Sequence, residues 1–399
     1  MSVLSINAGS SSIRFSFHGA GSPPAKLLDG KIERIGQGGT NLSLAETGRA
    51  TDPPPRLAVH AGDWHSAVGF LMGWLEAHPL FAEVQAVGHR VVHGMSHSSP
   101  ERVTEALLTE LKAITPYDPE HLPREIDLIE TMGRRFPRLP QVACFDTAFH
   151  RSMPRVATIL PIPRRYQSRG VQRYGFHGLS YTFLLQELAR AGDPAAARGR
   201  VIMAHLGSGA SLAAVRDGRC IDTSMGFTPA SGLPMSTRSG DVDPGLMCFL
   251  ALNEGMDAAT FQHMTTHESG LLGLSETSSD IRDLLARERE DVRAAEAVAL
   301  FCYQTRKWIG AFAAALGGLD TLVFAGGIGE NSAPIRTRIC EGLKFLGIVL
   351  HEERNAGNAP LVSSDAGGVT VRVIRTDEES VIAGLTIGAL ALKVNGNEP

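Results

Sequence analysis

The chain has few cysteines, and none of them is spaced as a metal or redox site requires. Its 399 residues include five, which are Cys144, Cys220, Cys248, Cys302 and Cys340. The number is odd, the spacing is wide and no C-x-x-C pair occurs, which excludes a zinc ribbon and a disulfide framework. Such cysteines are typically small buried residues in a reducing compartment, so we expect a cytoplasmic protein.

The chain also lacks a strong charge of one sign and a long uninterrupted apolar run. Lys and Arg number 38 and Asp and Glu 42, giving a net charge of −4 and no basic footprint for nucleic acid. The first residues lack the basic flank and apolar core of a signal peptide. The apolar stretch Ile309–Gly329 is broken by glycines and by Asp320, which predicts a buried helix followed by a strand. We therefore expect neither nucleic acid nor a membrane as a partner.

A glycine-rich turn stands at the centre of the most informative segment, Val201–Thr223. Apolar runs on both sides of His205–Gly209, and a second turn at Asp217-Gly218, predict strand, turn, strand, turn and strand. Glycines at such a turn let backbone N–H groups approach an anion such as a phosphate. An ordinary hairpin turn is the alternative explanation.

The N-terminus nearly repeats this pattern. The strand Val3–Ile6 meets a turn of small residues beginning at Asn7, and Asp29-Gly30 further on predicts a second turn like Asp217-Gly218. Two such meanders, roughly a domain length apart, indicate an internal duplication, and 399 residues with 43% hydrophobic content favour two domains. A third glycine cluster, Ala325–Asn331, is predicted to follow a strand and precede a helix. Three glycine-rich turns whose backbone N–H groups can face phosphate oxygens suit a nucleoside triphosphate held between two related halves.

Charged residues stand at several predicted strand ends and turns. Arg90, between Gly88 and Gly94, follows a strand and could clamp a carboxylate or phosphate, or be a solvated arginine. Asp146 ends the strand Val142–Phe145, where ligands bind in α/β sheets, although an Asp at this place also caps helices. A lone histidine such as His177 is more often structural.

Regular spacing of apolar residues predicts the remaining elements. Helices are expected at Trp64–Leu75, Val103–Ile114, Ile126–Met132, Ala294–Leu316 and Ser380–Val394, and strands at Val84–Val87, Asp320–Phe324 and Val369–Val373. The segment 235–244, with one Arg and two Asp, is predicted to be a functional loop. Acidic residues 377–379 would complement the dipole of the terminal helix.

Seven motifs in one order give the chain a specific resemblance. They are INAGSSSIRF (6–15), GHRVVHG (88–94), FDTAFH (145–150), RYGFHG (173–178), HLGSG (205–209), DTSMGFTP (222–229) and GGIGEN (326–331). With them the chain resembles the acetokinase family over nearly its whole length. The resemblance implies an α/β fold of two duplicated actin-like (ASKHA, ribonuclease H-like) domains with a nucleotide cleft between them. The domains would span 1–148 and 149–379, with the helix at about 380–399 packing back on the first.

The resemblance also implies an activity and its cofactors. It implies reversible phosphoryl transfer from ATP to acetate, giving acetyl phosphate and ADP, with Mg²⁺ as cofactor and Mn²⁺ as the alternative ion. The enzyme would be a cytoplasmic homodimer whose acceptor is a carboxyl group. Catalysis would be mainly positioning and electrostatics, because the loose transition state spreads charge over the equatorial oxygens.

Residue roles follow from the motif matches alone. The catalytic residues would be Asp146, His177 and Arg238; the acid-binding residues Arg90, Val92, Phe176 and Pro229; and the metal-associated residues Asn7 and Glu378. The ATP-binding residues would be Arg14, His205, Leu206, Gly207, Ser208, Gly209, Asp280, Ile281, Arg282, Gly327, Ile328, Gly329, Glu330 and Asn331. Since a carboxyl group with a pKa of roughly 4 to 5 is already ionised at neutral pH, we hypothesise that Asp146 orients an active-site group or a magnesium-bound water.

The chain departs from the family pattern at several positions. Arg14 and Ser208 replace the usual Lys and Asn, and Leu179 and Tyr181 replace Thr and His. The segment Thr115–Pro123 does not match the family's APLHNP, whose leucine helps to close the acyl pocket, and Tyr117 would take that place. We predict a short acid, with acetate first and propionate second.

Other functions compatible with the sequence are a propionate or butyrate kinase, a pyrophosphate-dependent variant, a non-catalytic ATP-binding switch of the actin type, and a sugar kinase. Gly327 and Ile328 keep a site of small residues for adenine, which favours ATP. The joint presence of Arg90, Asp146, His177 and Arg238 opposes a non-catalytic switch. No cysteine-rich zinc motif or sugar-binding acidic pair is evident, which opposes a sugar kinase.

Overall fold

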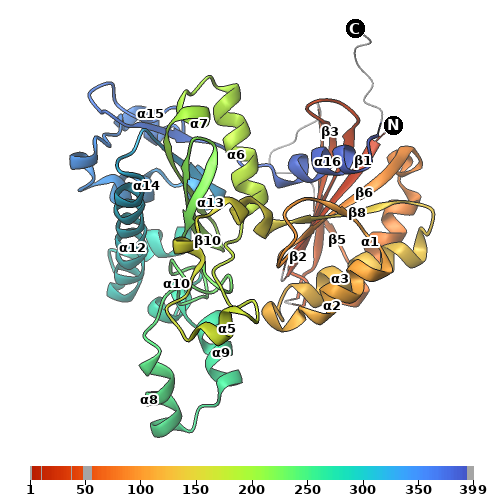
Figure 1. Ribbon diagram of the computed structural model, residues 1–399, viewed down its shortest axis with the longest axis horizontal. Coiled ribbons are helices and arrows are strands. Elements are labelled where there is room, and N and C mark those ends of the chain that lie inside the picture. The colour runs from red at the N-terminus through yellow and green to blue at the C-terminus, as the bar shows by residue number, and fades with distance from the viewer. Residues whose placement is uncertain (1, 10, 37, 48–55, 393–399) are drawn as a thin grey trace. The chain divides into compact units, whose positions relative to one another are not determined.

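Two compact units make up the chain. The computed structural model describes residues 2–9, 11–36, 38–47 and 56–392. Unit 1 takes in the described parts of Met1–Ala148, Gly178–Phe183 and Asp377–Pro399, and unit 2 comprises Phe149–His177 and Leu184–Thr376. Each unit is built around its own mixed sheet (Figure 1).

Unit 1 carries, in the part of the chain that the structure describes, an eight-stranded sheet. Its strands are β1 (Ser2–Ala8), β2 (Ser12–Gly19), β3 (Ala25–Glu33), β4 (Asn41–Glu46), β5 (Arg56–Ala58), β6 (Val84–Val91), β7 (Glu101–Arg102) and β8 (Gln141–Phe145). Their order is β5-β4-β3-β2-β1-β6-β8-β7. The meander β1 to β5 is antiparallel, whereas β6 runs parallel to both β1 and β8.

Unit 2 repeats the central part of this sheet. Its described strands are β9 (Arg200–Leu206), β10 (Ala210–Arg216), β11 (Arg219–Thr223), β12 (Thr321–Ala325) and β13 (Thr370–Val373), in the order β11-β10-β9-β12-β13. The meander is again antiparallel and the two crossover strands are again parallel. This order matches β3-β2-β1-β6-β8 strand for strand, so the predicted duplication is confirmed.

The two Asp-Gly pairs differ in structure, and one prediction about them is wrong. Asp217 and Gly218 have φ of 51° and 74° and form the tight turn between β10 and β11. Asp29 and Gly30 form no turn, because they lie inside the continuous strand β3. A Cβ on Gly30 would come within 2.1 Å of the ring of Phe15, its partner on β2. Glycine is required there for close packing and not for a change of chain direction.

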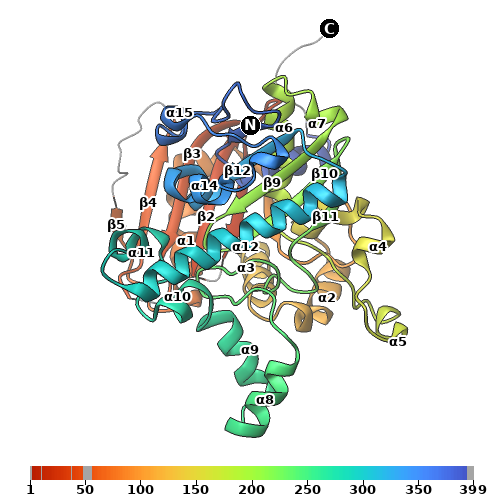
Figure 2. The ribbon, with the colours of Figure 1, turned by 90° about the vertical axis from the view of Figure 1, so that its left-hand side faces the viewer.

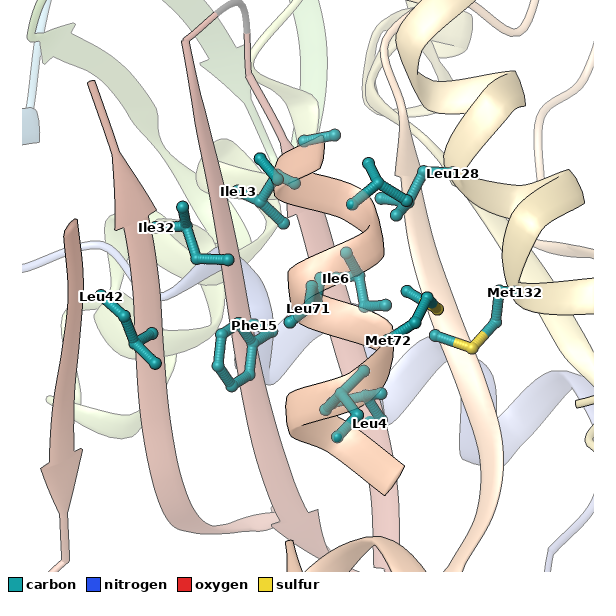
Figure 3. Close-up of a cluster of buried hydrophobic side chains, with 14 of the residues drawn as sticks. Leu4, Ile6, Ile13, Phe15, Ile32, Leu42, Leu71, Met72, Leu128 and Met132 are labelled. Carbon is teal, nitrogen blue, oxygen red and sulfur yellow. The ribbon is translucent and has the colours of Figure 1, made fainter. Parts of the chain in front are cut away.

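Helices cover both faces of the unit 1 sheet. They are α1 (Trp64–Ala77), α2 (Glu105–Ala113), α3 (Leu122–Arg135), α16 (Glu378–Ala389) and the 3₁₀ helices η1 (Pro79–Glu83) and η2 (Thr115–Tyr117). Successive β1 residues point to opposite faces. Leu4 and Ile6 therefore join the cluster that contains Leu71 of α1 and Leu128 of α3 (Figure 3), whereas Val3 packs with α16. The terminal helix begins two residues before its predicted start and ends at Ala389; residues 393–394 of the prediction lie outside the described residues.

The helices of unit 2 surround its sheet and its long loop. They are α4 (Arg155–Thr158), α5 (Arg164–Gln167), α7 (Ala195–Arg198), α8 (Gly245–Glu254), α9 (Ala258–His267), α10 (Gly270–Ser275), α11 (Ile281–Arg287), α12 (Val292–Leu316), α13 (Gly326–Asn331), α14 (Ala333–Cys340), α15 (Glu352–Ala356) and η4 (Lys344–Leu346). The helix α6 (Gly178–Arg190) is divided between the units after Phe183, and η3 (Asp146–Ser152) is divided after Ala148. The long helix α12 packs against β9 and β10 (Figure 2). The third glycine cluster follows β12 and precedes helix α14, as predicted, and its residues 326–331 themselves form the short helix α13.

The exclusions drawn from composition can be compared with the structure. Within the described ranges, no helix is long and apolar enough to cross a membrane. All five cysteines are free, and four of them are buried as expected. Cys248 is the exception, because it lies exposed on α8.

Candidate active site

A buried arginine and aspartate form the centre of the candidate site in unit 1. Arg90 lies near the end of β6 and Asp146 directly follows β8. The Nε and Nη2 groups of Arg90 donate to Oδ2 of Asp146 at 3.1 and 2.7 Å. Since the two side chains are only 12% and 1% exposed, Arg90 is not a solvated arginine. Asp146 also accepts a hydrogen bond from the backbone N–H of Leu179 at 3.2 Å, which fixes the carboxylate that holds Arg90.

A second carboxyl group reaches Arg90 from helix α3, and the sequence prediction missed it. Oε1 of Glu125 accepts from Nη1 of Arg90 at 3.3 Å, and Oε2 accepts from the backbone N–H of Val92 at 2.9 Å. Burial raises the pKa of Glu125 to about 8, although the charge of Arg90 lowers it. One signal in the sequence could have indicated this residue. Glu125 stands three residues after Leu122, on the apolar face of an amphipathic helix.

Acidic residues at the start of α16 approach β1. The amide nitrogen of Asn7 donates to Glu378 at 2.8 Å and to Glu379 at 3.3 Å. Burial raises the pKa of Glu378, and the charge of Asp146 raises it further. Burial and the charge of Glu378 likewise raise the pKa of Glu379. Arg14, which pairs with Asn7 across β1 and β2, acts in the opposite direction on both glutamates.

The charges in this cluster suit a divalent cation. Four carboxyl groups (Glu125, Asp146, Glu378 and Glu379) lie near only two guanidinium groups (Arg14 and Arg90), so acidic groups are in excess. No group of three or more His, Cys, Asp or Glu side chains in the described ranges is arranged to hold a metal. Mg²⁺ does not need one, since it commonly binds one or two carboxylates together with water and phosphate oxygens. The oxygens of Asn7 and Glu378 therefore fit magnesium, and their role as its ligands stays a prediction.

In unit 2, two side chains converge on the turn between β9 and β10. The N–H of Gly207 donates to the carbonyl oxygen of Gly209 at 3.0 Å, which closes the turn. A Cβ on Gly209 would lie 3.2 Å from Nε2 of His177 and 3.7 Å from Nη1 of Arg238. A larger residue at this position would crowd both side chains. Glycine therefore leaves room at the point where they meet.

The conformation of His177 is tightly specified. Its φ of 58° is left-handed, which is uncommon for a residue other than glycine and typical of functional sites. Its Nδ1 lies 2.8 Å from the hydroxyl of Ser211, and its ring stacks on that of His205 with centroids 4.3 Å apart. These contacts turn the other ring nitrogen, Nε2, toward Gly209. The catalytic role of His177 stays a prediction.

Arg238 is positioned by its own loop. The predicted functional loop contains neither helix nor strand between 224 and 244. Nη1 of Arg238 donates to the carbonyl oxygen of Pro229 at 3.1 Å, and the backbone carbonyl of Arg238 accepts from the N–H of Met235 at 2.9 Å. The side chain remains partly exposed, so its guanidinium keeps hydrogen-bonding capacity for a ligand.

The second and third glycine clusters meet in unit 2. A Cβ on Gly326 would come within 2.7 Å of the carbonyl oxygen of Leu206, and one on Gly207 would lie 3.9 Å from the nitrogen of Gly327. A Cβ on Gly327 would meet no atom within 4 Å, so the backbone is open there. The carboxylate of Glu330 accepts from the N–H groups of Gly326 and Thr376 and holds α13 in place. The two clusters therefore form one backbone surface that a phosphate chain could approach.

The remaining predicted residues are placed less decisively. Asp280 caps α11 and pairs with Arg282, whose side chain is 85% exposed. Ile281 is buried, Ile328 is half-buried and Asn331 is exposed. Their part in the nucleotide site stays a prediction.

Phe176 and Val92 are buried and Pro229 is half-buried. Val92 belongs to unit 1, whereas Phe176 and Pro229 belong to unit 2. A shared methyl pocket therefore also stays a prediction.

Comparison with known proteins decides the family. The model of the acetokinase family matches residues 2–384. The chain belongs to the acetokinase family. It is 40% identical to the acetate kinase of Methylocella silvestris over 97% of this chain and 98% of that protein. It is 41% identical to the propionate kinase of Citrobacter rodentium over 96% of this chain and 95% of that protein.

A solved structure agrees with this assignment. The acetate kinase of Porphyromonas gingivalis superposes with a TM-score of 0.85 at 34% identity, covering 98% of this chain and 99% of that one. The predicted α/β fold with two duplicated units is thereby confirmed. Membership of the acetokinase family makes the chain a kinase of short-chain carboxylic acids, and kinases of this family use ATP and a divalent metal ion. Relatives named for acetate and for propionate match it equally well.

Proposed function

We propose that this protein is an acetate kinase, which transfers the γ-phosphoryl group of ATP reversibly to acetate. An oxygen of the acetate carboxylate attacks the γ-phosphorus in line, and the bond to the bridging oxygen of ADP breaks as the new P–O bond forms. The observation that supports this most directly is the convergence of His177 and Arg238 on Gly209, beside the backbone surface of the glycine clusters. Such preorganised donors stabilise the charge of a transferring phosphoryl group.

Each group of residues has a part in this proposal. Arg90 binds the acetate carboxylate, and Val92, Phe176 and Pro229 contact its methyl group. The turn His205–Gly209, together with α13, holds the nucleotide. The proposal requires the two units to act on one phosphoryl group, because Arg90 belongs to unit 1 and Arg238 to unit 2.

Asn7 and Glu378 would hold magnesium, which when bound neutralises phosphate charge. Asp146 orients Arg90, which is the first of the two roles in our hypothesis. The two hydrogen bonds from Arg90 to its carboxylate support this role.

The choice of acid depends on the segment that departs from the family pattern. Tyr117 ends η2, and its ring lies against that of His93 with centroids 5.7 Å apart. We propose that this aromatic ring takes the place of the family's leucine and limits the length of the acyl chain. A preference for propionate is the alternative, favoured by the propionate kinases that match the chain at equal identity.

Acetate is expected to give the highest kcat/KM in a panel from formate to butyrate, with propionate second. Butyrate should fall roughly 10-fold or more below acetate, because one or two extra methylenes in a closed pocket cost about that much. Acyl phosphate is trapped as the hydroxamate with purified protein and Mg-ATP. Omitting the acid provides the control, and pyrophosphate in place of ATP tests the pyrophosphate-dependent alternative. A preference for butyrate would contradict the ranking, and binding of ATP without acyl phosphate would favour the non-catalytic switch.

We also propose that the protein is a homodimer. Helix α8 is rich in apolar residues, yet none of its ten residues is buried. Phe249 and Leu252 are 59% and 86% exposed, and Val242 just before the helix is 42% exposed. The helices α8 and α9 project from the rest of unit 2 (Figures 1 and 2). A second copy of the chain would cover this apolar surface.

The double variant Phe249→Asp, Leu252→Asp is expected to be a monomer, because two charges in an apolar interface cannot be desolvated without cost. Sedimentation velocity at micromolar concentration measures the change against the wild-type dimer. Asn253→Asp, which adds a charge on the same helix at a position that is already polar, serves as the matched control. A double variant that still sediments as a dimer would show that this surface is not the interface.

A further inference from the structure

One buried carboxyl group joins the two unit 1 residues that are proposed to bind the acid. Oε1 of Glu125 contacts the guanidinium of Arg90, and Oε2 accepts a hydrogen bond from the backbone N–H of Val92. Arg90 would hold the carboxylate of the substrate, and Val92 would contact its methyl group. The side chain of Glu125 is only 1% exposed, so these contacts are made away from bulk water.

We propose that Glu125 is a positioning residue for the acid substrate: its carboxyl group fixes the guanidinium of Arg90 and the backbone of Val92 in the arrangement that receives a carboxylate. The inference rests on the proposed function. Glu125 acts through its neighbours and does not take part in the phosphoryl transfer.

The place of Glu125 on α3 favours such a role over a purely structural one. The helix buries Leu122, Ile126, Leu128, Ile129 and Met132, so an apolar residue would pack well at position 125. A buried carboxyl group is costly unless its oxygens are hydrogen-bonded. Both oxygens of Glu125 are used: one contacts Arg90 on β6, and the other contacts Val92, which directly follows that strand.

Arg90 is held from two sides by this arrangement. Asp146 accepts from Nε and Nη2, whereas Glu125 accepts from Nη1. Rotation of the guanidinium is therefore restrained in its plane. A charge-assisted contact between the guanidinium and the carboxylate of the substrate depends on that orientation.

The charge of Glu125 adds a dependence on pH. The charged groups that act on Glu125 are Arg90 on β6, Asp146 after β8 and Asp118 before α3. The carboxylate of Asp118 in turn lies 3.0 Å from Nδ1 of His121. Burial, as the largest cause, raises the pKa of Glu125 to about 8. Below this pH the group is neutral, and Asp146 is the carboxylate that remains hydrogen-bonded to Arg90. Above it, two carboxylates share one guanidinium and repel the carboxylate of the substrate, so the KM for the acid should rise.

The test compares Glu125→Ala, Glu125→Asp and Glu125→Gln with the wild type by steady-state kinetics between pH 6 and pH 9. Glu125→Ala should raise the KM for acetate about 10- to 100-fold, because hydrogen bonds to a charged group are lost. Glu125→Asp has a side chain one methylene too short to make both contacts, so its KM for acetate should lie between those of the wild type and Glu125→Ala. Glu125→Gln keeps the size of the side chain and cannot ionise, so its KM for acetate should lack the rise above pH 8. The KM for ATP should stay within about twofold of wild type, since the nucleotide contacts are untouched.

The matched control is Glu130→Gln, on the same helix. Glu130 is paired with Lys112 and lies outside the site, so this variant should behave as wild type. The inference is overturned if Glu125→Ala and Glu125→Asp leave the KM for acetate unchanged, or if the KM values for acetate and ATP rise together. It is also overturned if Glu125→Gln keeps the alkaline rise. A wild-type protein that makes no acyl phosphate from any acid would instead refute the proposed function, and the inference with it.

Discussion

Replacing Arg90 by alanine is expected to raise the KM for acetate at least about 100-fold, because a charge-assisted contact with the carboxylate is lost. The same change should lower the free energy of unfolding by about 3–5 kcal/mol, as removal of one partner of a buried ion pair does. Asp146 and Glu125 would lose their common hydrogen-bond donor. Hydroxamate kinetics measure the first effect and urea denaturation the second.

Arg90→Lys separates charge from geometry. A lysine should recover most of the stability, because it restores a positive charge near Asp146. It should recover little of the KM, because an ammonium group does not reproduce the planar donor geometry of a guanidinium. Arg102→Ala, at an exposed position on β7 at the edge of the same sheet, is the control for removing an arginine as such. Near wild-type KM in Arg90→Ala would rule out Arg90 as the carboxylate ligand.

Arg238→Ala should reduce kcat by about 10²–10³-fold, the loss typical of removing one donor that stabilises transition-state charge. Nη1 of Arg238 lies beside the position of Gly209 and the ring of His177, where the phosphoryl group is expected. The stability should change by less than about 1 kcal/mol, because Arg238 is partly exposed and bonded to a backbone carbonyl. The measurement is kcat at saturating acetate and ATP, together with thermal unfolding.

Arg287→Ala supplies the control for Arg238→Ala, since Arg287 is an exposed arginine of the same unit. An unchanged kcat in Arg238→Ala would remove this residue from the proposed mechanism. An equal fall in kcat in both variants would indicate an effect of the lost positive charge in general rather than of a specific contact of Arg238. A rise in KM without a fall in kcat would indicate that Arg238 binds the ground state.

Much of the fold was predictable because its signals are local. Strands β1, β9 and β12 are short apolar runs bounded by glycine, and α1 and α12 have apolar residues at helical spacing. The meander that opens each unit was recognisable twice, so the duplication could be inferred without coordinates. Arg90 and Asp146 could be selected because each stands at the carboxyl end of an apolar strand.

Other features depended on residues that are distant in the sequence. Gly30 has the sequence pattern of a turn, yet it lies within a strand, and the ring of Phe15 occupies the space that a side chain at this position would need. Glu125 stands on the apolar face of α3, yet its sequence position does not reveal its bond to Arg90, 35 residues earlier in the chain. Cys248 has the pattern of a buried residue, yet it is exposed on α8. In each case the partner, or the lack of one, is set by how the elements pack.

The order of its motifs was enough to assign this chain to a family and to nominate side chains for the chemistry, because motifs and periodicities are properties of neighbouring residues. Which carboxyl groups surround Arg90, which ring orients His177 and which backbone atoms meet at Gly209 emerged from the packed structure. These contacts join residues far apart in the chain, so their geometry is a product of tertiary packing, which local spacing does not encode.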